Sequence, residues 1–249
     1  MSRGSSSPLA PLLAYPARLA RVDLRQTSIE LDGIFARHGA TSQPTSPDVL
    51  FVQRAFPDAA MATKVYESER IARATMSHVR AAPFFTSIVV TIHPKPEIEA
   101  PMLVVDLRVI PTGAVRAYLD VCGPAITKKS FGTNFRTPLA HTLDAAVASA
   151  VTRRPVPTWI EGLSGGCGAQ LAARPGRGSV VAHALVRYVE RYLEGLDSAP
   201  ASDDAFANLA TLRTVRDTAR ANGRAGTYLA RAFGAPVAAR YLEVLWNES

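Results

Sequence analysis

The centre of the chain has three runs with the residue types and spacing of β-strands. In the middle run, Leu, Val and Leu side chains recur at every second position, which is the period of a strand with one face against a core. Residues 111–114, Pro-Thr-Gly-Ala, separate the second and third runs, and this composition favours an antiparallel hairpin. The sequence therefore predicts an antiparallel sheet from the runs Thr86–His93, Met102–Ile110 and Val115–Cys122.

The spacing of apolar residues becomes helical after these strands. Thr137 followed by Pro138 is typical of a helix start, because threonine caps the first turn and proline fits it. Apolar residues then recur as far as Val151, and we expect this helix to end before Pro155. The segment Val180–Leu196 repeats apolar residues at helical spacing without interruption, which predicts a second, amphipathic helix.

Two further segments complete this outline. Met61–Val79 mixes apolar and charged residues, and we interpret it as a surface helix that stops near Pro83. The glycine-rich stretch Gly162–Gly178 is expected to be rich in loops. Because helices cluster after the strands instead of alternating with them, the predicted fold class is α+β, with helices packed on the sheet.

Length and composition indicate one globular unit. The chain has 249 residues, of which 47% are apolar, and this is enough to build one substantial core. We expect a loose segment over residues 1–14 and a single domain over residues 15–249. The run Leu9–Tyr15 is too short and too often interrupted by proline to be a signal or membrane segment, so we expect no membrane partner.

The net charge of +7 favours an acidic partner or an anionic ligand. The positive residues are almost all arginine and are scattered, with no basic run longer than Arg153-Arg154 or Lys128-Lys129. Proteins that bind nucleic acid usually concentrate such residues in a stripe, so we expect no nucleic-acid partner. An acidic electron-carrier protein is a second class of partner that the positive net charge would attract.

The two cysteines, Cys122 and Cys167, are 45 positions apart and form no CxxC or Cys-His pattern. Neither a metal site nor a disulfide framework is therefore indicated, and two reduced cysteines suit a cytoplasmic protein. The stretch Gly162–Gly178 lacks both the Gly-Lys-Ser/Thr ending of a phosphate-binding loop and the strand-turn-helix context of a dinucleotide site.

The C-terminal segment Tyr188–Asn247 has the most specific pattern. Two apolar-striped helical segments flank a loop there. The order of residues resembles the C-terminal signature of the ferredoxin-dependent bilin reductases, in which a loop with Asn precedes a helix ending in Ala-Phe-Gly, followed by Ala-x-x-Tyr and a hydrophobic Leu. The counterparts here are Asn222, Ala232-Phe233-Gly234, Ala238, Tyr241 and Leu245.

Other parts of the chain extend this resemblance over roughly residues 64–247. The family has a strand, a proline, a linker and then a Pro followed by hydrophobic residues and an Asp, and later an Asp-x-x-Pro stretch, a Pro-x-Trp segment that runs to Arg-Pro, and a Tyr-x-x-x-Tyr-Leu helix. The counterparts are Val89–Pro94, Ala100–Asp106, Asp120–Pro124, Pro157–Pro175 and Tyr188–Leu196.

The resemblance implies a fold and an activity. The fold is a three-layer α/β/α sandwich with a central, mainly antiparallel sheet, and the tetrapyrrole lies between the sheet and the C-terminal helices. The activity is the reduction of an open-chain tetrapyrrole such as biliverdin by sequential electron and proton transfer. Reduced ferredoxin supplies the electrons and the chain binds no flavin, haem or metal of its own. We expect a monomer in which the excess positive charge helps an acidic ferredoxin to dock.

The resemblance places the catalytic acid at Asp106. A carboxyl group against an apolar tetrapyrrole loses hydration, so its pKa rises toward the range that suits proton donation. The alternative role for Asp106 is an ion pair with Arg108 or Arg116. Asn222 falls where the family has an Asn or Asp that orients water or gives a proton on the other side of the substrate, and its alternative role is an Asn-Gly turn between helices.

One position departs from the family pattern. Val89 stands where the family usually has a polar His or Asn beside the substrate, and valine can neither donate a proton nor hydrogen-bond a pyrrole carbonyl. His93 lies four positions further on the same strand face and partly substitutes for it, or makes an ordinary strand-end hydrogen bond. The departure affects which carbon is reduced, and leaves open a different substrate.

The propionates of a bilin need cationic partners, and arginine binds carboxylates with two parallel hydrogen bonds. Arg174 and Arg224 lie in the matched segments and are the candidates. Trp159 and Tyr188 either line the pocket or belong to the core. Three other functions stay open: a reductase of the same fold for a chlorophyll catabolite or specialised metabolite, a non-catalytic bilin-binding protein, and an unrelated α+β protein acting on a small anion.

Overall fold

The computed structural model describes residues 22–44, 51–54, 59–81, 84–149, 151–222 and 225–246. The strands in these residues form one nine-stranded sheet in the order β1-β3-β4-β5-β6-β7-β9-β8, with β2 paired to β3, and the neighbouring strands are antiparallel. Their bounds are β1 (Thr41–Gln43), β2 (Phe51–Arg54), β3 (Ala59–Glu67), β4 (Ile71–Ala81), β5 (Phe85–Pro94), β6 (Met102–Val109), β7 (Val115–Cys122), β8 (Thr152–Arg154) and β9 (Ala169–Ala173).

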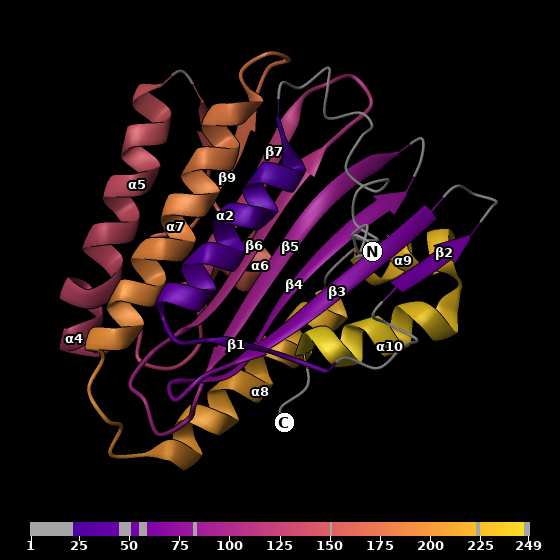
Figure 1. The fold of residues 1–249 in the computed structure, drawn as a ribbon. Coiled ribbons are helices and arrows are strands. Elements are labelled where there is room, and N and C mark those ends of the chain that lie inside the picture. The colour runs from indigo at the N-terminus through magenta and orange to yellow at the C-terminus, as the bar shows by residue number, and fades with distance from the viewer. Residues whose placement is uncertain are drawn as a thin grey trace, which may run out of the picture.

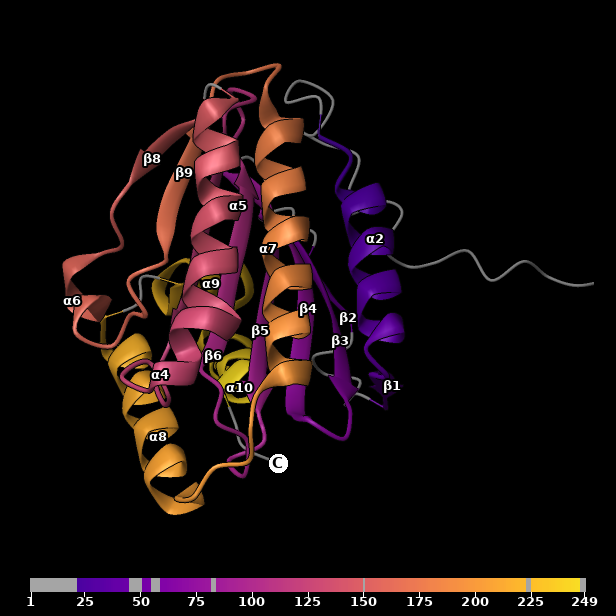
Figure 2. The same cartoon turned by 90° about the vertical axis from the view of Figure 1, so that its left-hand side faces the viewer.

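Helices cover both faces of this sheet (Figures 1 and 2). The long helix α7, together with α2 and α5, packs on one face, while α8, α9 and α10 pack on the other. This three-layer arrangement confirms the predicted α+β sandwich. The helices are α2 (Leu24–Arg37), α4 (Lys129–Phe131), the π-helical turn η1 (Gly132–Arg136), α5 (Thr137–Ala148), α6 (Thr158–Glu161), α7 (Gly178–Ser198), α8 (Ala205–Asn222), α9 (Ala225–Phe233) and α10 (Ala235–Trp246).

The three predicted strands are confirmed as β5, β6 and β7, and the predicted helices as α5 and α7. In β6 the alternation holds: Leu103, Val105 and Leu107 join the core under α7, while Asp106 faces the side of α8–α10. The segment expected to be loose, residues 1–14, lies outside the described residues.

The predicted helix Met61–Val79 is wrong, because this segment is the β3–β4 hairpin. Both strands are covered by helices, so apolar residues occupy both strand faces and hide the period of two. The charges that suggested a helix surface gather near the turn, at Glu67, Glu69 and Arg70. The expected loop Gly162–Gly178 also contains strand β9, which pairs with β7 and β8.

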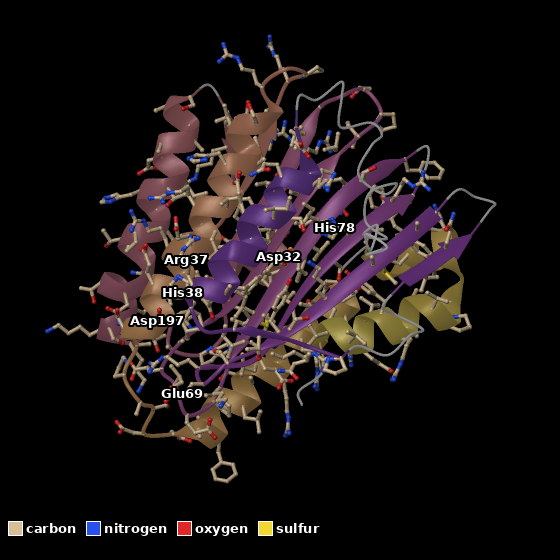
Figure 3. The ribbon with its side chains drawn as sticks, in the orientation of Figure 1. Asp32, Arg37, His38, Glu69, His78 and Asp197 are labelled. Carbon is tan, nitrogen blue, oxygen red and sulfur yellow. The ribbon has the colours of Figure 1, made fainter. Side chains whose placement is uncertain are left out.

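A polar cluster ties α2 to the sheet on the α7 side. Asp32 of α2 accepts hydrogen bonds from Lys64, at 2.7 Å, and from the hydroxyl of Tyr66. The ring of buried His78 lies 3.0 Å from the Ser28 hydroxyl of the same helix, and Figure 3 shows Asp32 and His78 on this side of the sheet. Burial lowers the pKa of His78 to about 4, with Lys64 adding to this effect and Asp32 opposing it. His78 is therefore neutral near pH 7.

Candidate active site

A single row of side chains crosses the sheet face that α8–α10 cover. Residues directly opposite each other on antiparallel strands point to the same face, so the register alone aligns them. Asp106 lies at the centre of this row, between Val89 and Tyr118. From β3 to β8 the row consists of Thr63, Ser77, Val89, Asp106, Tyr118, Gln170 and Arg154.

Only one of the two carboxyl oxygens of Asp106 has a hydrogen-bond partner among the described residues. Its Oδ2 atom lies 2.6 Å from Nη2 of Arg108, so the ion pair considered as an alternative role is present. Its Oδ1 atom is buried and has no hydrogen-bond partner among the described residues. Burial raises the pKa of Asp106 above its ordinary value, while the Arg108 guanidinium opposes that rise. The result is a carboxyl group that can hold a proton and has one oxygen free to present it.

The cation beside Asp106 is held in place by an aromatic ring. The guanidinium of Arg108 lies 4.9 Å from the centroid of the Phe85 ring, a cation–π distance. Its Nε atom is buried and makes no hydrogen bond within the described residues. The Phe85 ring therefore holds this guanidinium beside Asp106, and no other carboxylate pairs with it in the described part of the chain.

Helix α10 lies over the row. The Nε2 atom of His93 is 3.1 Å from the carbonyl oxygen of Leu245, and the Thr91 hydroxyl donates to the same oxygen at 3.4 Å. The phenol of Tyr241 is buried, and its hydroxyl has no hydrogen-bond partner of good geometry among the described residues. Burial raises the pKa of Tyr241, Ser77 lowers it and Asp106 raises it further, which places this phenol near the row.

Two of the predicted site residues, Val89 and His93, lie on the same sheet face as Asp106. Val89 is its direct cross-strand neighbour. His93 lies on the same face, four positions along β5, and makes the strand-end hydrogen bond to Leu245 that was its alternative role. The roles assigned to these side chains in a reaction remain predictions.

In the part of the chain that the structure describes, none of the other predicted site residues forms a hydrogen bond or ion pair with Asp106. Asn222 is exposed at the end of α8, and its amide donates to the Thr218 carbonyl of the same helix at 3.0 Å, which agrees with a local, helix-ending role. Arg174 is exposed four positions beyond Gln170, which corresponds to roughly 13 Å along the strand from the row. Trp159 of α6 is 36% exposed. Arg224 lies outside the described residues.

Tyr188, which was considered for the pocket, belongs to the core on the opposite face. It is fully buried on α7, and its hydroxyl donates to the Cys167 carbonyl at 3.1 Å. Its neighbour Tyr192 donates in the same way to the Pro101 carbonyl at 2.7 Å. Both tyrosines therefore anchor α7 to the sheet. Cys122 and Cys167 are buried free thiols.

Sequence reasoning missed a group of polar residues beside the row. Asp120 of β7 is completely buried and accepts hydrogen bonds from Tyr118, Ser164 and the Val121 amide. Ser164 lies 44 positions further along the chain, in the loop before β9, so no local pattern joins the two. The signal in the sequence was an Asp between the apolar residues Leu119 and Val121 near the end of a strand.

A cavity of about 460 Å³ opens at the β8–β9 end of the row. Ser164 and Arg154 are among its lining residues, together with Arg153, Pro155, Val156, Glu161, Gly166 and Gly168. A second cavity, of about 660 Å³, lies between α5 and α7 on the opposite side of the sheet. Of these two cavities, the first therefore borders the face that carries Asp106.

In the residues that the structure describes, no group of three or more His, Cys, Asp or Glu side chains is arranged to hold a metal ion. Across the same residues, no helix combines the length and the apolar character needed to cross a membrane.

The fold is shared with a solved bilin-binding enzyme. The crystal structure of phytochromobilin synthase from tomato in complex with biliverdin matches with a TM-score of 0.72, covering 90% of this chain and 83% of that chain at 12% sequence identity. No family model matches the chain, and no curated protein sequence matches it either. The likeness therefore lies in the fold.

Proposed function

We propose that the chain is a reductase of an open-chain tetrapyrrole that takes single electrons from reduced ferredoxin. The observation that carries the proposal is the carboxyl group of Asp106, which combines a raised pKa with a buried, unpartnered oxygen on the sheet face covered by α8–α10. The solved protein that shares this fold holds biliverdin. No cofactor of the chain's own is part of the proposal.

The chemistry assigned to Asp106 follows from its position. An electron added to a conjugated tetrapyrrole makes a radical that must be protonated at one chosen carbon. Asp106 sits in the middle of a strand that is hydrogen-bonded on both sides, so its carboxyl group can deliver that proton from a fixed place. Arg108 remains as the counter-charge for the carboxylate that is left behind.

The surroundings of this acid suit an apolar pigment. The helices α8–α10 and the facing strands share one apolar cluster that includes Met61, Val79, Met102, Leu229 and Phe233. The net charge of +7 suits docking of an acidic, one-electron carrier in the cytoplasm, with attraction that weakens as salt is added.

Val89 favours a second candidate within the same fold. An apolar side chain directly opposite Asp106 removes the second polar group that the resemblance leads one to expect beside the substrate. The second candidate is a reductase of the same fold whose substrate is a chlorophyll catabolite or a specialised metabolite. It differs from the first in substrate and keeps Asp106 as the acid.

A structure of the protein soaked with biliverdin tests the proposal, because it measures the distances from Asp106 and His93 to the pyrrole rings. We expect the pigment on the α8–α10 side with a reducible carbon within reach of Asp106. Pigment bound elsewhere on the molecule contradicts the assignment, and absence of binding together with turnover of another substrate selects the second candidate.

A further inference from the structure

A second buried carboxyl group lies on the same sheet face as Asp106. Oδ1 of Asp120 accepts a hydrogen bond from the Ser164 hydroxyl at 2.8 Å and from the Val121 amide at 2.9 Å. Its Oδ2 atom accepts from the Tyr118 hydroxyl at 3.1 Å. The side chain is completely buried, and the chemistry assigned to Asp106 makes no use of it.

One end of this group of hydroxyls reaches the cavity. Ser164 lines the space of about 460 Å³, and so does Gly168. A Cβ atom on Gly168 would lie 2.2 Å from Oδ1 of Asp120, so the carboxyl group occupies the room that a side chain would take. The absence of a side chain at position 168 therefore lets Asp120 lie directly beneath the wall of the cavity.

The other end of the group reaches the row. Tyr118 is the direct cross-strand neighbour of Asp106, and such neighbours hold their Cβ atoms about 5 Å apart. The hydroxyls of Ser164 and Tyr118 thus flank Asp120 on two sides, one at the cavity and one toward the centre of the sheet.

The charge balance suits proton exchange at Asp120. Burial raises the pKa of Asp120 to about 6, although its three hydrogen bonds lower it. The other ionisable groups that act on it or respond to it stay neutral near pH 7, because burial raises the pKa of each. These groups are Tyr118 and Cys122 on its own strand, Cys167 in the loop before β9, and Tyr188 on α7.

We propose that Ser164, Asp120 and Tyr118 form a proton relay from the cavity to a substrate bound beside Asp106. This inference rests on the proposed function. Reduction of one double bond takes two electrons from the external donor and two protons, of which Asp106 gives one. For the other, Tyr118 gives its hydroxyl proton to the substrate and receives the carboxyl proton of Asp120. Asp120 then takes the proton of Ser164, Ser164 takes one from water in the cavity, and the hydroxide left there takes a proton from bulk solvent. Every group in the relay ends as it began, and the substrate gains one proton by this path.

Three substitutions interrupt the relay at different points: Tyr118→Phe, Asp120→Asn and Ser164→Ala. Tyr192→Phe is the control for Tyr118→Phe, because it also removes a phenol hydroxyl that donates a hydrogen bond, here to the Pro101 carbonyl on the opposite side of the sheet. We expect each relay variant to slow single-turnover reduction of biliverdin by about 10- to 100-fold, and the control by less than about 3-fold. Formate, a small acid that fits the cavity, should restore part of the rate in Ser164→Ala.

A readout without turnover separates this inference from the proposed function. Infrared spectroscopy of the unliganded protein at about pH 5, below the pKa of Asp120, should show a protonated carboxyl band that is absent in Asp120→Asn. Hydrogen–deuterium exchange of this band should be slower in Ser164→Ala. If wild type exchanges as expected but reduces no bilin, the proposed function fails and the proton path stands. Relay variants with wild-type rates, or a band whose exchange is unchanged in Ser164→Ala, overturn the relay.

Discussion

Val89 and Asp106 lie directly opposite each other on β5 and β6, on the face of the sheet that α8, α9 and α10 cover. An apolar side chain thus stands next to the one carboxyl group of the row. Because Asp106 has no polar cross-strand neighbour on the β5 side, its surroundings there are poorly solvating, and this burial favours its protonated form.

Asparagine at position 89 should change the outcome of the reaction. Val89→Asn puts an amide beside Asp106, where it can hydrogen-bond a pyrrole carbonyl and turn the substrate relative to the acid. We expect a changed ratio of reduced products and a loss of about 1 to 2 kcal/mol of stability, because the new polar group is half-buried. Chromatography of the products measures the ratio.

Val180→Asn is the control for this substitution, because Val180 is also half-buried but packs on the α7 side of the sheet. It should cost similar stability and leave the product ratio unchanged. Identical product ratios for wild type and Val89→Asn count against a substrate position beside Val89.

Replacing Asp106 separates catalysis from pigment binding. Asp106→Asn removes the acid but keeps the shape of the side chain, so turnover should fall by at least about 100-fold while pigment affinity changes only a few-fold. The free energy of unfolding should change by about 1 kcal/mol or less. The variant loses a partly exposed ion pair with Arg108, but it no longer has to bury a carboxylate, and the two effects oppose each other.

Asp217→Asn, in an exposed ion pair on α8, is the control and should keep full turnover. If Asp106→Asn also retains wild-type turnover, another group is the acid. If wild type binds the pigment without turning it over, the chain is a bilin-binding protein.

Gly168→Ala tests how tightly the loop before β9 is held against Asp120. The added methyl group would meet Oδ1 of Asp120 at 2.2 Å and the Leu119 carbonyl at 2.9 Å, so either the loop or the carboxyl group must move. We expect a loss of about 2 to 4 kcal/mol in the free energy of unfolding. Gly162→Ala, in the same stretch and without any atom within 4 Å of the new methyl group, should change it by less than about 0.5 kcal/mol. Equal stabilities of the two variants in denaturant titrations would disprove this packing.

His78 should make the fold sensitive to acid. Its pKa is about 4 in the folded protein against an ordinary value of 6.5, so the unfolded chain binds more protons between these pH values. The stability contributed by neutral His78 is therefore present above pH 6.5 and lost as the pH falls to 4, by about 3 kcal/mol. His78→Gln should lose this dependence, and parallel stability curves for variant and wild type between pH 7 and pH 4 would contradict it.

Asp120 should change the stability of the fold with pH in the opposite direction to His78, over nearly the same pH range. Its folded pKa is about 6 against an ordinary 3.8, so the folded state binds more protons between these values, and the stability it contributes is lost as the pH rises from 4 to 6. Relative to Asp120→Asn, wild type should lose about 3 kcal/mol over this range. A constant difference between the two unfolding curves would show that Asp120 does not titrate there.

The sequence predicts those strands in which apolar and polar residues alternate, because only there is the period of two visible. β6 alternates apolar residues against Asp106 and Arg108, so both its existence and its inward face were predictable. The β3–β4 hairpin was not, because small and β-branched residues such as Ala62 and Val79 fill both of its faces and the charges lie at its turn.

The candidate site was predictable only in part, because its members meet through strand register. The pairing of Val89 with Asp106 follows from the register of β5 and β6, and the resemblance had placed both residues beside the substrate. The contact of Asp120 with Ser164 depends on how the loop folds back onto β7, which no local pattern encodes. Asn222 was expected opposite Asp106 across the substrate, and that role stays a prediction. Its amide donates to the Thr218 carbonyl of its own helix.

The central claim is that this protein reduces a bilin, and one absorbance measurement tests it most directly. Purified protein is mixed with biliverdin under anaerobic conditions, and spectra are recorded before and after reduced ferredoxin is added. The account predicts a red-shifted complex on mixing, followed by loss of the biliverdin bands and growth of a reduced product once electrons are supplied. Spectra of free biliverdin that stay unchanged through both additions would contradict it.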